Sequence, residues 1–293
     1  MRKLLTTMIA ITAIFTATAQ HHSLQEARLF AYSRTDRLII GSCDIHADYD
    51  VVDTSRIAVS YKATYRNSPN SHLEVRYKLL CGEATSLFYS IAQHYTNMAR
   101  YKNGWSEEEL EEFYAAGDCT IVIPTEVYTT KEEARIRHNI PFADDIIYEY
   151  TLPMSNIKWQ LSDETCQIHG YNCTKASAMF EGRNWVVWFT TEISIAEGPW
   201  LLRGLPGLIL LAEDSEGDFR FEMEGVAKES EEIRLYKWSS KRITKKQWMK
   251  YERGALQNPY SQFSQGGKVQ FFNSNDMSEL KDEWTIPYYP IYK

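Results

Sequence analysis

The sequence lacks the short motifs that mark the common catalytic and cofactor-binding sites. It contains no GxSxG, HExxH, P-loop or GxGxxG pattern, so nothing in it specifies a serine hydrolase, a zinc protease or a nucleotide-dependent enzyme. Its seven histidines are scattered without the spacing of metal ligands. The sequence therefore predicts no cofactor, and it offers no assembled pair of nucleophile and base.

Positive charge is also scarce. The chain carries 32 lysines and arginines against 39 aspartates and glutamates, which gives a formal net charge of −7. No segment concentrates basic residues. This charge balance argues against nucleic acid as a partner and against binding to anionic lipid headgroups.

Long apolar stretches are absent except at the N-terminus. The apolar run over residues 4–15 follows two basic residues and is too short to span a bilayer. Ala17 and Ala19 supply the small residues that signal peptidase accepts, so we expect residues 1–19 to be a cleaved signal peptide. A retained anchor or a buried first helix is the alternative. Because no cysteine stands at the cleavage point, we expect a periplasmic or otherwise exported chain with no lipid anchor and no membrane span.

Two patterns offer oxygen or nitrogen ligands to a metal. After cleavage the mature chain would begin Gln20-His21-His22, and its amine, two amides and the His22 imidazole can form a square plane that suits Cu(II) or Ni(II). The alternative is a flexible end whose Gln20 cyclises and removes the amine. The acidic segment 213–218 reads as a solvated turn, and it lacks the ligand pattern of an EF-hand calcium loop.

Alternating apolar and polar residues dominate the remaining chain and predict a mainly β fold. In residues 56–65 every second side chain is apolar, and residues 72–80 repeat the pattern after a turn cluster at 66–71. The length suits one large β-rich domain or two small ones. Because we find no internal repeat and no low-complexity linker, we expect a single domain over 20–293. Further strands are expected at 119–124, 146–152, 183–190 and 218–225.

Helices are expected to be few and short. One is predicted over 106–117, because Ser106 can cap it with Glu109 three residues later and Gly117 can end it. A second is predicted to begin at Thr244 and to end near Gly254.

Five cysteines suggest two disulfides and one free thiol in an oxidising compartment. His169 and Gly170 lie midway between Cys166 and Cys173, so a symmetric hairpin places the two cysteines opposite each other. A two-residue loop would make them a hydrogen-bonded pair, and a four-residue loop would make them the closer, non-hydrogen-bonded type. Both separations suit a disulfide, so we predict a 166–173 bridge that fixes strand register; the spacing does not fit a CxxC redox pair. The sequence leaves open how Cys43, Cys81 and Cys119 pair.

Residues 203–210, RGLPGLIL, combine a strand-like apolar run with three strand breakers. We expect Gly204 and Gly207 to let the chain bulge or fold tightly, with Pro206 at a bulge or strand start. The alternative is functional: the amides of the two glycines would form an anion or ligand site beside Arg203.

The strand at 183–190 is apolar on both faces, so we expect it to be central and covered on both sides. Its Trp188, or the later Trp200, is the aromatic ring against which we expect the glycine-rich segment to pack.

These segments together resemble the GLPGLI family of exported proteins, best known from Bacteroidetes. The similarity rests on GYNCTKA, GRNWVVWFT, GPW and GLPGLIL, and it is specific over about 159–225. The chain departs from the family pattern at Ser194, where proline is usual, and at Tyr289, where asparagine is usual. The structural motif of the resemblance consists of Gly204, Leu205, Pro206, Gly207, Leu208 and Ile209.

The resemblance implies a signal peptide, a curved, half-barrel-like antiparallel sheet and no established biochemical activity. Some members are encoded near outer-membrane receptor genes, which implies an envelope role and an outer-membrane or envelope protein partner.

Two functional interpretations follow. The first is a non-catalytic exported envelope protein whose curved sheet binds an apolar or peptide-like ligand, or a protein partner, with Trp188, Trp200 and Arg203 as candidate ligand residues. The alternative is a hydrolase with dispersed catalytic residues, for which Arg203, Glu192 and His169 are the first candidates. The absence of a nucleophile–base pair favours the first interpretation.

Overall fold

The computed structural model describes residues 14–15, 48–98, 126–139, 147–228, 230–257, 272–273 and 288–293. Several sequence expectations fall outside these ranges and stay predictions. They are the signal peptide (apart from residues 14–15), the candidate metal site at Gln20 and His22, the helix at 106–117, the strand at 119–124, and the pairing of Cys43 and Cys119.

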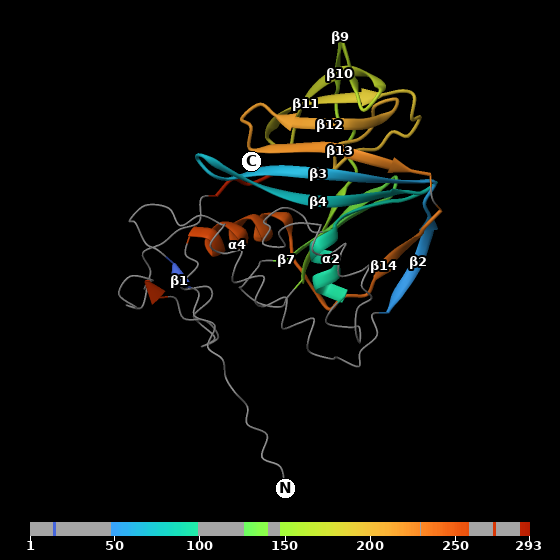
Figure 1. Ribbon diagram of the computed structural model, residues 1–293. Coiled ribbons are helices and arrows are strands. Elements are labelled where there is room, and N and C mark those ends of the chain that lie inside the picture. The colour runs from blue at the N-terminus through green and yellow to red at the C-terminus, as the bar shows by residue number, and fades with distance from the viewer. Residues whose placement is uncertain are drawn as a thin grey trace.

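One large sheet forms most of the described structure (Figure 1), and it has twelve strands. Its strand order is β15-β8-β7-β6-β5-β4-β3-β13-β12-β11-β10-β9, and every pairing is antiparallel except the parallel one between β15 and β8. Because the two edge strands β15 and β9 do not pair, the sheet is open and not a closed barrel. The predicted mainly β, antiparallel fold is confirmed. The strands are β3 (Ile57–Ser68), β4 (Ser71–Cys81), β5 (Ser86–Ser90), β6 (Glu126–Thr129), β7 (Glu133–Asn139), β8 (Ile147–Pro153), β9 (Gln160–Ile168), β10 (Tyr171–Phe180), β11 (Arg183–Thr190), β12 (Leu208–Asp214), β13 (Phe219–Ala227) and β15 (Ser240–Arg242).

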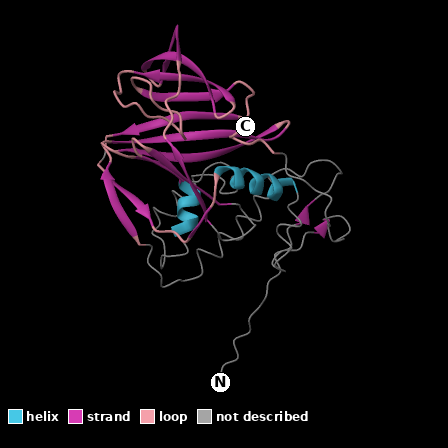
Figure 2. Ribbon diagram, turned by 180° about the vertical axis from the view of Figure 1, so that it is seen from behind, coloured by secondary structure: helices cyan, strands magenta, loops and turns pink. Residues whose placement is uncertain are grey.

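Smaller elements flank this main sheet. Strands β2 (Tyr49–Thr54) and β14 (Glu232–Tyr236) form a separate antiparallel ribbon, and β1 (Ile14–Phe15) pairs in parallel with β16 (Phe272–Asn273). Two helices, α2 (Ile91–Met98) and α4 (Lys245–Gln257), are drawn below the uppermost strands in Figure 2. No helix in the described ranges is long and apolar enough to cross a membrane.

The predicted second helix is confirmed as α4, and its start follows from local chemistry. The Thr244 hydroxyl accepts a hydrogen bond from the Gln247 amide at 3.2 Å, and the Thr244 amide donates to Gln247 Oε1 at 2.7 Å. This reciprocal pair is a capping box. The helix runs three residues beyond Gly254, where the sequence suggested its end.

The main core lies on one face of the sheet, which we call the inner face. The alternating apolar residues of β3 and β4 point into it, as expected, and Tyr61, Tyr77 and Trp185 are completely buried there. Helix α4 covers this face through Trp248, and Tyr292 packs beside it. The aromatic inner face is therefore filled by the chain's own segments.

Strand β11 lies inside the sheet, third from the β9 edge, and it is not covered equally on both faces, as the prediction of a central strand covered on both sides required. Trp185, Val187 and Phe189 are buried, whereas Val186 and Trp188 on the other face are only half-buried. The prediction that both faces are covered is therefore wrong for the face that carries Val186 and Trp188.

The β9–β10 hairpin has the predicted register, but the predicted disulfide is not formed. His169 and Gly170 form a two-residue turn with φ of 49° and 85°, and Cys166 stands directly opposite Cys173. Both thiols are free. A two-residue loop makes them a hydrogen-bonded pair, in which side chains stand farther apart than in the other type. Cys173 Sγ instead donates to the Tyr171 carbonyl oxygen at 3.5 Å.

The glycine-rich segment shapes the chain through its backbone, and the indole Nε1 of Trp159 donates to the Arg203 carbonyl oxygen at 2.8 Å. Gly204 has a φ of 90°, which favours glycine. Gly207 lies against the backbone of Thr190, where an added Cβ would stand 1.9 Å from the carbonyl oxygen. Pro206 precedes β12 by two residues, so its missing amide removes no bond from the sheet.

Candidate functional site

A cavity of about 440 Å³ lies between the outer face of the main sheet, helix α2 and strand β14. Its volume falls in the range of small-molecule sites. Three parts of the chain that are far apart in sequence contribute to it: residues 80–94, residue 126 and residues 230–236. The lining residues are Leu80 of β4, Leu87 and Tyr89 of β5, His94 of α2, Glu126 of β6, and Ser230, Glu231, Glu232, Arg234 and Tyr236 on and before β14.

The β2–β14 ribbon is held beside this cavity by Asp53. Its Oδ2 accepts hydrogen bonds from the amides of Ala84 at 2.9 Å and Thr85 at 3.0 Å, in the turn between β4 and β5. Gly82 in that turn leaves room for the carboxylate, because a Cβ there would lie 2.3 Å from Oδ2. Burial pushes the pKa of Asp53 up, but these bonds and one from the Thr54 amide outweigh burial and lower it. The ribbon is thus fixed to the sheet by an ionised carboxylate.

Apolar side chains build the side of the cavity that belongs to the sheet. Leu80 and Leu87 point to the outer face, because they alternate with residues that point to the inner core. They pack with the buried Ile233 of the ribbon. Leu80 and Leu87 therefore give the cavity an apolar wall.

Aromatic rings form a second wall. The His94 ring lies 5.0 Å from that of Tyr89 and 5.3 Å from that of Tyr236, centroid to centroid. Tyr236 stacks in turn on Trp238 at 4.8 Å. Burial, and then the nearby charge of Lys78, lowers the pKa of His94 to about 4, so its imidazole is neutral near pH 7.

Charged side chains on the cavity wall are held by defined partners. Glu126 Oε1 accepts from Arg137 Nη1 at 2.6 Å, and Arg137 Nε donates to Glu149 Oε2 at 2.8 Å. Nη1 of the same guanidinium also reaches the Tyr236 carbonyl oxygen at 3.0 Å. The buried Arg137 therefore joins two sheet strands to the end of β14.

At the rim, two further carboxylates are paired. Lys78 Nζ donates to Glu231 Oε2 at 2.9 Å, and Arg234 Nε donates to Glu232 Oε2 at 2.9 Å. The Arg234 guanidinium also lies over the Tyr49 ring, 4.8 Å from its centroid. These contacts fix the direction of the polar groups around the opening.

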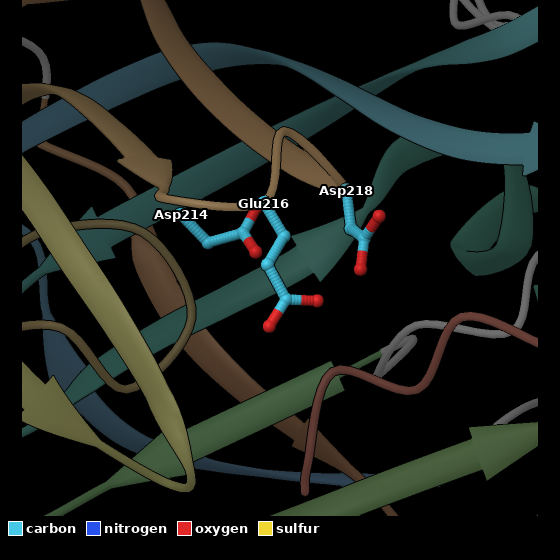
Figure 3. Close-up of side chains that lie close together, drawn as sticks. All are labelled: Asp214, Glu216 and Asp218. Atoms are coloured by element: carbon cyan, nitrogen blue, oxygen red, sulfur yellow. The ribbon is translucent and has the colours of Figure 1, made fainter.

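A different acidic cluster lies in the turn between β12 and β13. Oxygens of Asp214, Glu216 and Asp218 lie within 4.8 Å of one another, as Figure 3 shows. The sequence suggested a solvated turn, but Asp214 and Asp218 are buried. Arg183 explains this, because its Nη1 donates to both carboxylates, at 2.5 and 2.9 Å.

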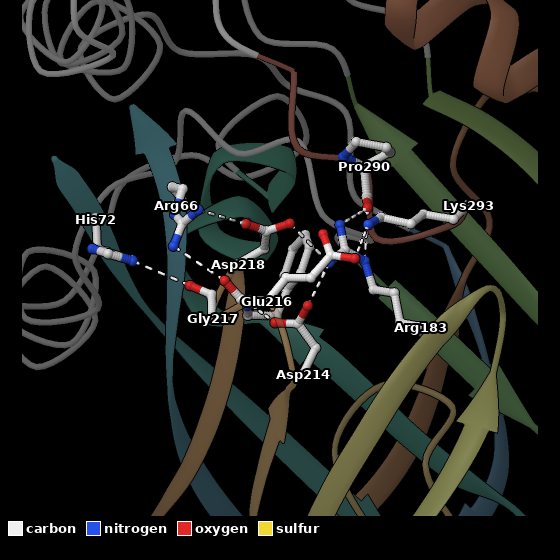
Figure 4. Close-up of polar contacts among 10 residues, drawn as sticks. Arg66, His72, Arg183, Asp214, Glu216, Gly217, Asp218, Pro290 and Lys293 are labelled. Carbon is white, nitrogen blue, oxygen red and sulfur yellow. Dashed lines mark hydrogen bonds and ion pairs between the residues drawn. The ribbon is translucent and has the colours of Figure 1, made fainter. Parts of the chain in front are cut away.

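Basic groups neutralise this cluster. Lys293 Nζ bonds to Glu216, and Arg66 pairs with Asp218 at 3.3 Å (Figure 4). With Arg183, three cations face three carboxylates, so little negative charge remains to attract a metal ion. Arg183 also donates to the Pro290 carbonyl oxygen, with Nε at 3.0 Å. We therefore interpret the cluster as an ion-pair network that fastens residues 288–293 to the sheet.

The three candidate ligand residues from the sequence are not brought together, and none lines the cavity. Trp200 is buried on the inner face, with ring centroids 5.6 Å from Trp185 and 5.4 Å from Tyr292. Trp188 is half-buried, with the Lys175 ammonium 5.9 Å from its ring centroid. Arg203 is likewise engaged elsewhere: its Nη2 donates to Glu197 Oε1 at 2.5 Å.

The hydrolase candidates also have structural partners. His169 occupies the β9–β10 turn, and Glu192 Oε1 accepts from the amide of Asn172 at 2.8 Å and from its side chain at 3.0 Å. The Gly204 amide donates to the Ala196 carbonyl oxygen at 3.0 Å, so it is not available to an anion beside Arg203. Among the described residues, no contact joins these groups into a nucleophile–base pair.

No protein-family model and no curated protein matches this chain. Among solved structures, PNGF-II is similar with a TM-score of 0.43 and 15% identity, over 69% of this chain and 34% of that protein, so the chain spans about a third of its length. An uncharacterised conserved protein from Thermus thermophilus has a TM-score of 0.33 and 8% identity, over 75% of this chain and 99% of that one. A LolA-superfamily protein from Nitrosomonas europaea has a TM-score of 0.23 and 8% identity, over 66% and 92%. These distant likenesses assign no activity, and the resemblance to the GLPGLI family is not confirmed by a family match.

Proposed function

We propose that this protein is a non-catalytic binding protein of the cell envelope, exported by a signal peptide at 1–19 and built as one domain of the GLPGLI family. Its ligand site is the cavity between the main sheet, α2 and β14. The observation that carries this proposal is the cavity itself: about 440 Å³, with an apolar wall and a few fixed polar groups, as small-molecule sites have. A partner in the envelope would deliver or receive the ligand.

The lining favours binding over catalysis. Leu80, Leu87 and Tyr89 suit the apolar body of a ligand, and the charged groups at the rim suit a polar end. A pKa of about 4 makes His94 a poor general base near pH 7, which argues against a hydrolytic site built around it.

Native mass spectrometry of the full chain, purified from its source organism, tests the proposal. We expect a bound small molecule on the wild-type protein and its loss in Leu87→Trp, which fills the cavity. Leu161→Trp is the matched control, because Leu161 is 63% exposed on β9, far along the sheet from β5. A bare wild-type chain, or equal occupancy in both variants, would overturn the assignment.

A further inference from the structure

Basic side chains pair with the carboxylates that line the cavity. Arg137 Nη1 lies 2.6 Å from Glu126 Oε1, and Lys78 Nζ lies 2.8 Å from Glu231 Oε1. Both basic groups are shielded from water, because the arginine side chain is 6% exposed and the lysine side chain 23%. Dissolved salt therefore screens these two pairs less than it screens pairs on an open surface.

The third carboxylate has its partner within the lining itself. Arg234 Nε lies 2.9 Å from Glu232 Oε2, and the Arg234 guanidinium also lies over the Tyr49 ring. Burial, and then the charge of Lys78, lowers the pKa of His94 to about 4, so this ring is uncharged near pH 7. Three basic groups thus face three acidic groups, and the described lining has no excess of either sign to attract an ion.

This pairing is unfavourable for a charged ligand. An ammonium or carboxylate group that enters the cavity either loses water without gaining a counter-ion or displaces one member of an existing pair. A hydroxyl group avoids both costs. It donates and accepts hydrogen bonds, so it can bond to a paired carboxylate or guanidinium without separating the pair.

The rest of the lining suits an apolar body. Leu80 and Leu87 form the wall on the side of the sheet, and the rings of Tyr89, His94 and Tyr236 form the aromatic wall. An apolar group gains free energy roughly in proportion to the area that it removes from water. The walls therefore supply affinity, and the paired charges select against ions.

We propose that the cavity binds an uncharged molecule with an apolar body and a hydroxyl-type polar end. The body lies on Leu80 and Leu87, against the aromatic wall, and the polar end lies among the paired side chains at the rim. This inference rests on the proposed function, because it requires that this cavity is the ligand site.

Three probes that share a phenyl group and differ in charge test the inference. Binding of 2-phenylethanol, 2-phenylethylamine and phenylacetate to the full chain, after removal of any bound molecule, is measured by ligand-observed NMR titration at pH 7. We expect the alcohol to bind at least about tenfold more tightly than either ion, because only the ions must be desolvated without a free counter-ion.

Lys78→Met tests the role of the pairing. Methionine keeps an apolar chain but removes the charge, so Glu231 loses its partner. We expect this variant to bind the amine at least as tightly as the alcohol, because the ammonium group then takes the place of the lysine charge. Lys62→Met is the matched control: Lys62 pairs with Glu74, neither residue lines the cavity, and the preference for the alcohol should remain.

The outcomes separate this inference from the proposed function. If either ion binds the wild type as tightly as the alcohol, and Leu87→Trp abolishes that binding, the inference is overturned and the cavity remains a ligand site. Equal probe preferences in Lys78→Met and Lys62→Met would also overturn it. Failure of all three probes to bind would refute the inference, and native mass spectrometry then decides the proposed function. If Lys78→Met does not fold, the wild-type comparison decides.

Discussion

At the scale of single residues, Gly207 shows what the glycine-rich motif does. Its Cα lies so close to the Thr190 carbonyl oxygen that a methyl group would overlap it at 1.9 Å. The atom in the way is backbone and cannot swing aside. The segment can therefore enter β12 only with glycine at this position.

We expect Gly207→Ala to lower the free energy of unfolding by about 2 kcal/mol or more, because β11 and β12 must move apart. Gly225→Ala is the matched control: nothing lies within 4 Å of its added Cβ, so its effect should stay within about 1 kcal/mol. Urea denaturation measures both. Equal stability of the two variants would show that the contact with the Thr190 carbonyl oxygen does not exclude a side chain at residue 207.

At Glu252, a single buried carboxyl makes the stability of the folded protein depend on pH. It is buried on α4 and accepts a hydrogen bond from the Tyr288 hydroxyl at 2.8 Å. Burial raises the pKa of its carboxyl to about 8, from 4.5 for the ordinary side chain, and the bond from Tyr288 opposes this only in part. The folded protein therefore holds a proton here that the unfolded chain releases.

This proton makes stability depend on pH. The stabilising contribution of Glu252 is complete below about pH 4.5 and is lost as pH rises toward 8. We expect the melting temperature of Glu252→Gln to fall less than that of the wild type between pH 5 and 8. Thermal unfolding across this range measures the difference. Parallel curves would mean that Glu252 is already ionised in the folded protein.

At the scale of elements, the Arg183 network joins the β12–β13 turn to residues 288–293. The guanidinium is fully buried and bonds to Asp214, Asp218 and the Pro290 carbonyl oxygen. Removing one partner of a buried ion pair leaves the other charges uncompensated.

We expect Arg183→Met to destabilise the protein by about 3–5 kcal/mol and to expose residues 288–293 to carboxypeptidase. Arg220→Met in β13 is the control. Its ion pair with Glu213 is 40% exposed on the arginine side and should contribute at most about 1 kcal/mol. Chemical denaturation and timed digestion report the two effects. If both variants behave alike, the network does not hold this segment.

Elements with a local signal could be predicted from the sequence. Strands β3 and β4 follow from strict alternation, the start of α4 from the capping pair of Thr244 and Gln247, and the β9–β10 register from the position of Gly170. The acidic turn was misread because its partner Arg183 lies 31 residues from Asp214. No local pattern contains that contact.

The cavity could not be predicted for the same reason. Glu126, His94 and Arg234 each look like ordinary surface residues of a strand or a helix, and only the packing of the β2–β14 ribbon on the sheet brings them together. The sequence suggested Trp200 as a ligand residue, but the chain fills the inner face with its own Trp200, Trp248 and Tyr292.

At the scale of the whole molecule, the sheet separates two environments. Its inner face is packed with aromatic side chains under α4, and its outer face meets α2 and the ribbon around the cavity. The motif-bearing strands β11 and β12 and the cavity-lining strands β4 to β6 belong to different parts of one sheet. We therefore assign a shaping role to the strands that carry the glycine-rich motif and ligand binding to the strands that line the cavity.

Hydrogen exchange of the full chain, purified from its source organism with its bound small molecule and again after that molecule is removed, tests this division most directly. We expect slower exchange in peptides covering residues 80–94 and 230–236 and no change over 183–207. Slower exchange centred on 183–207 would move the ligand to the glycine-rich motif and contradict the account.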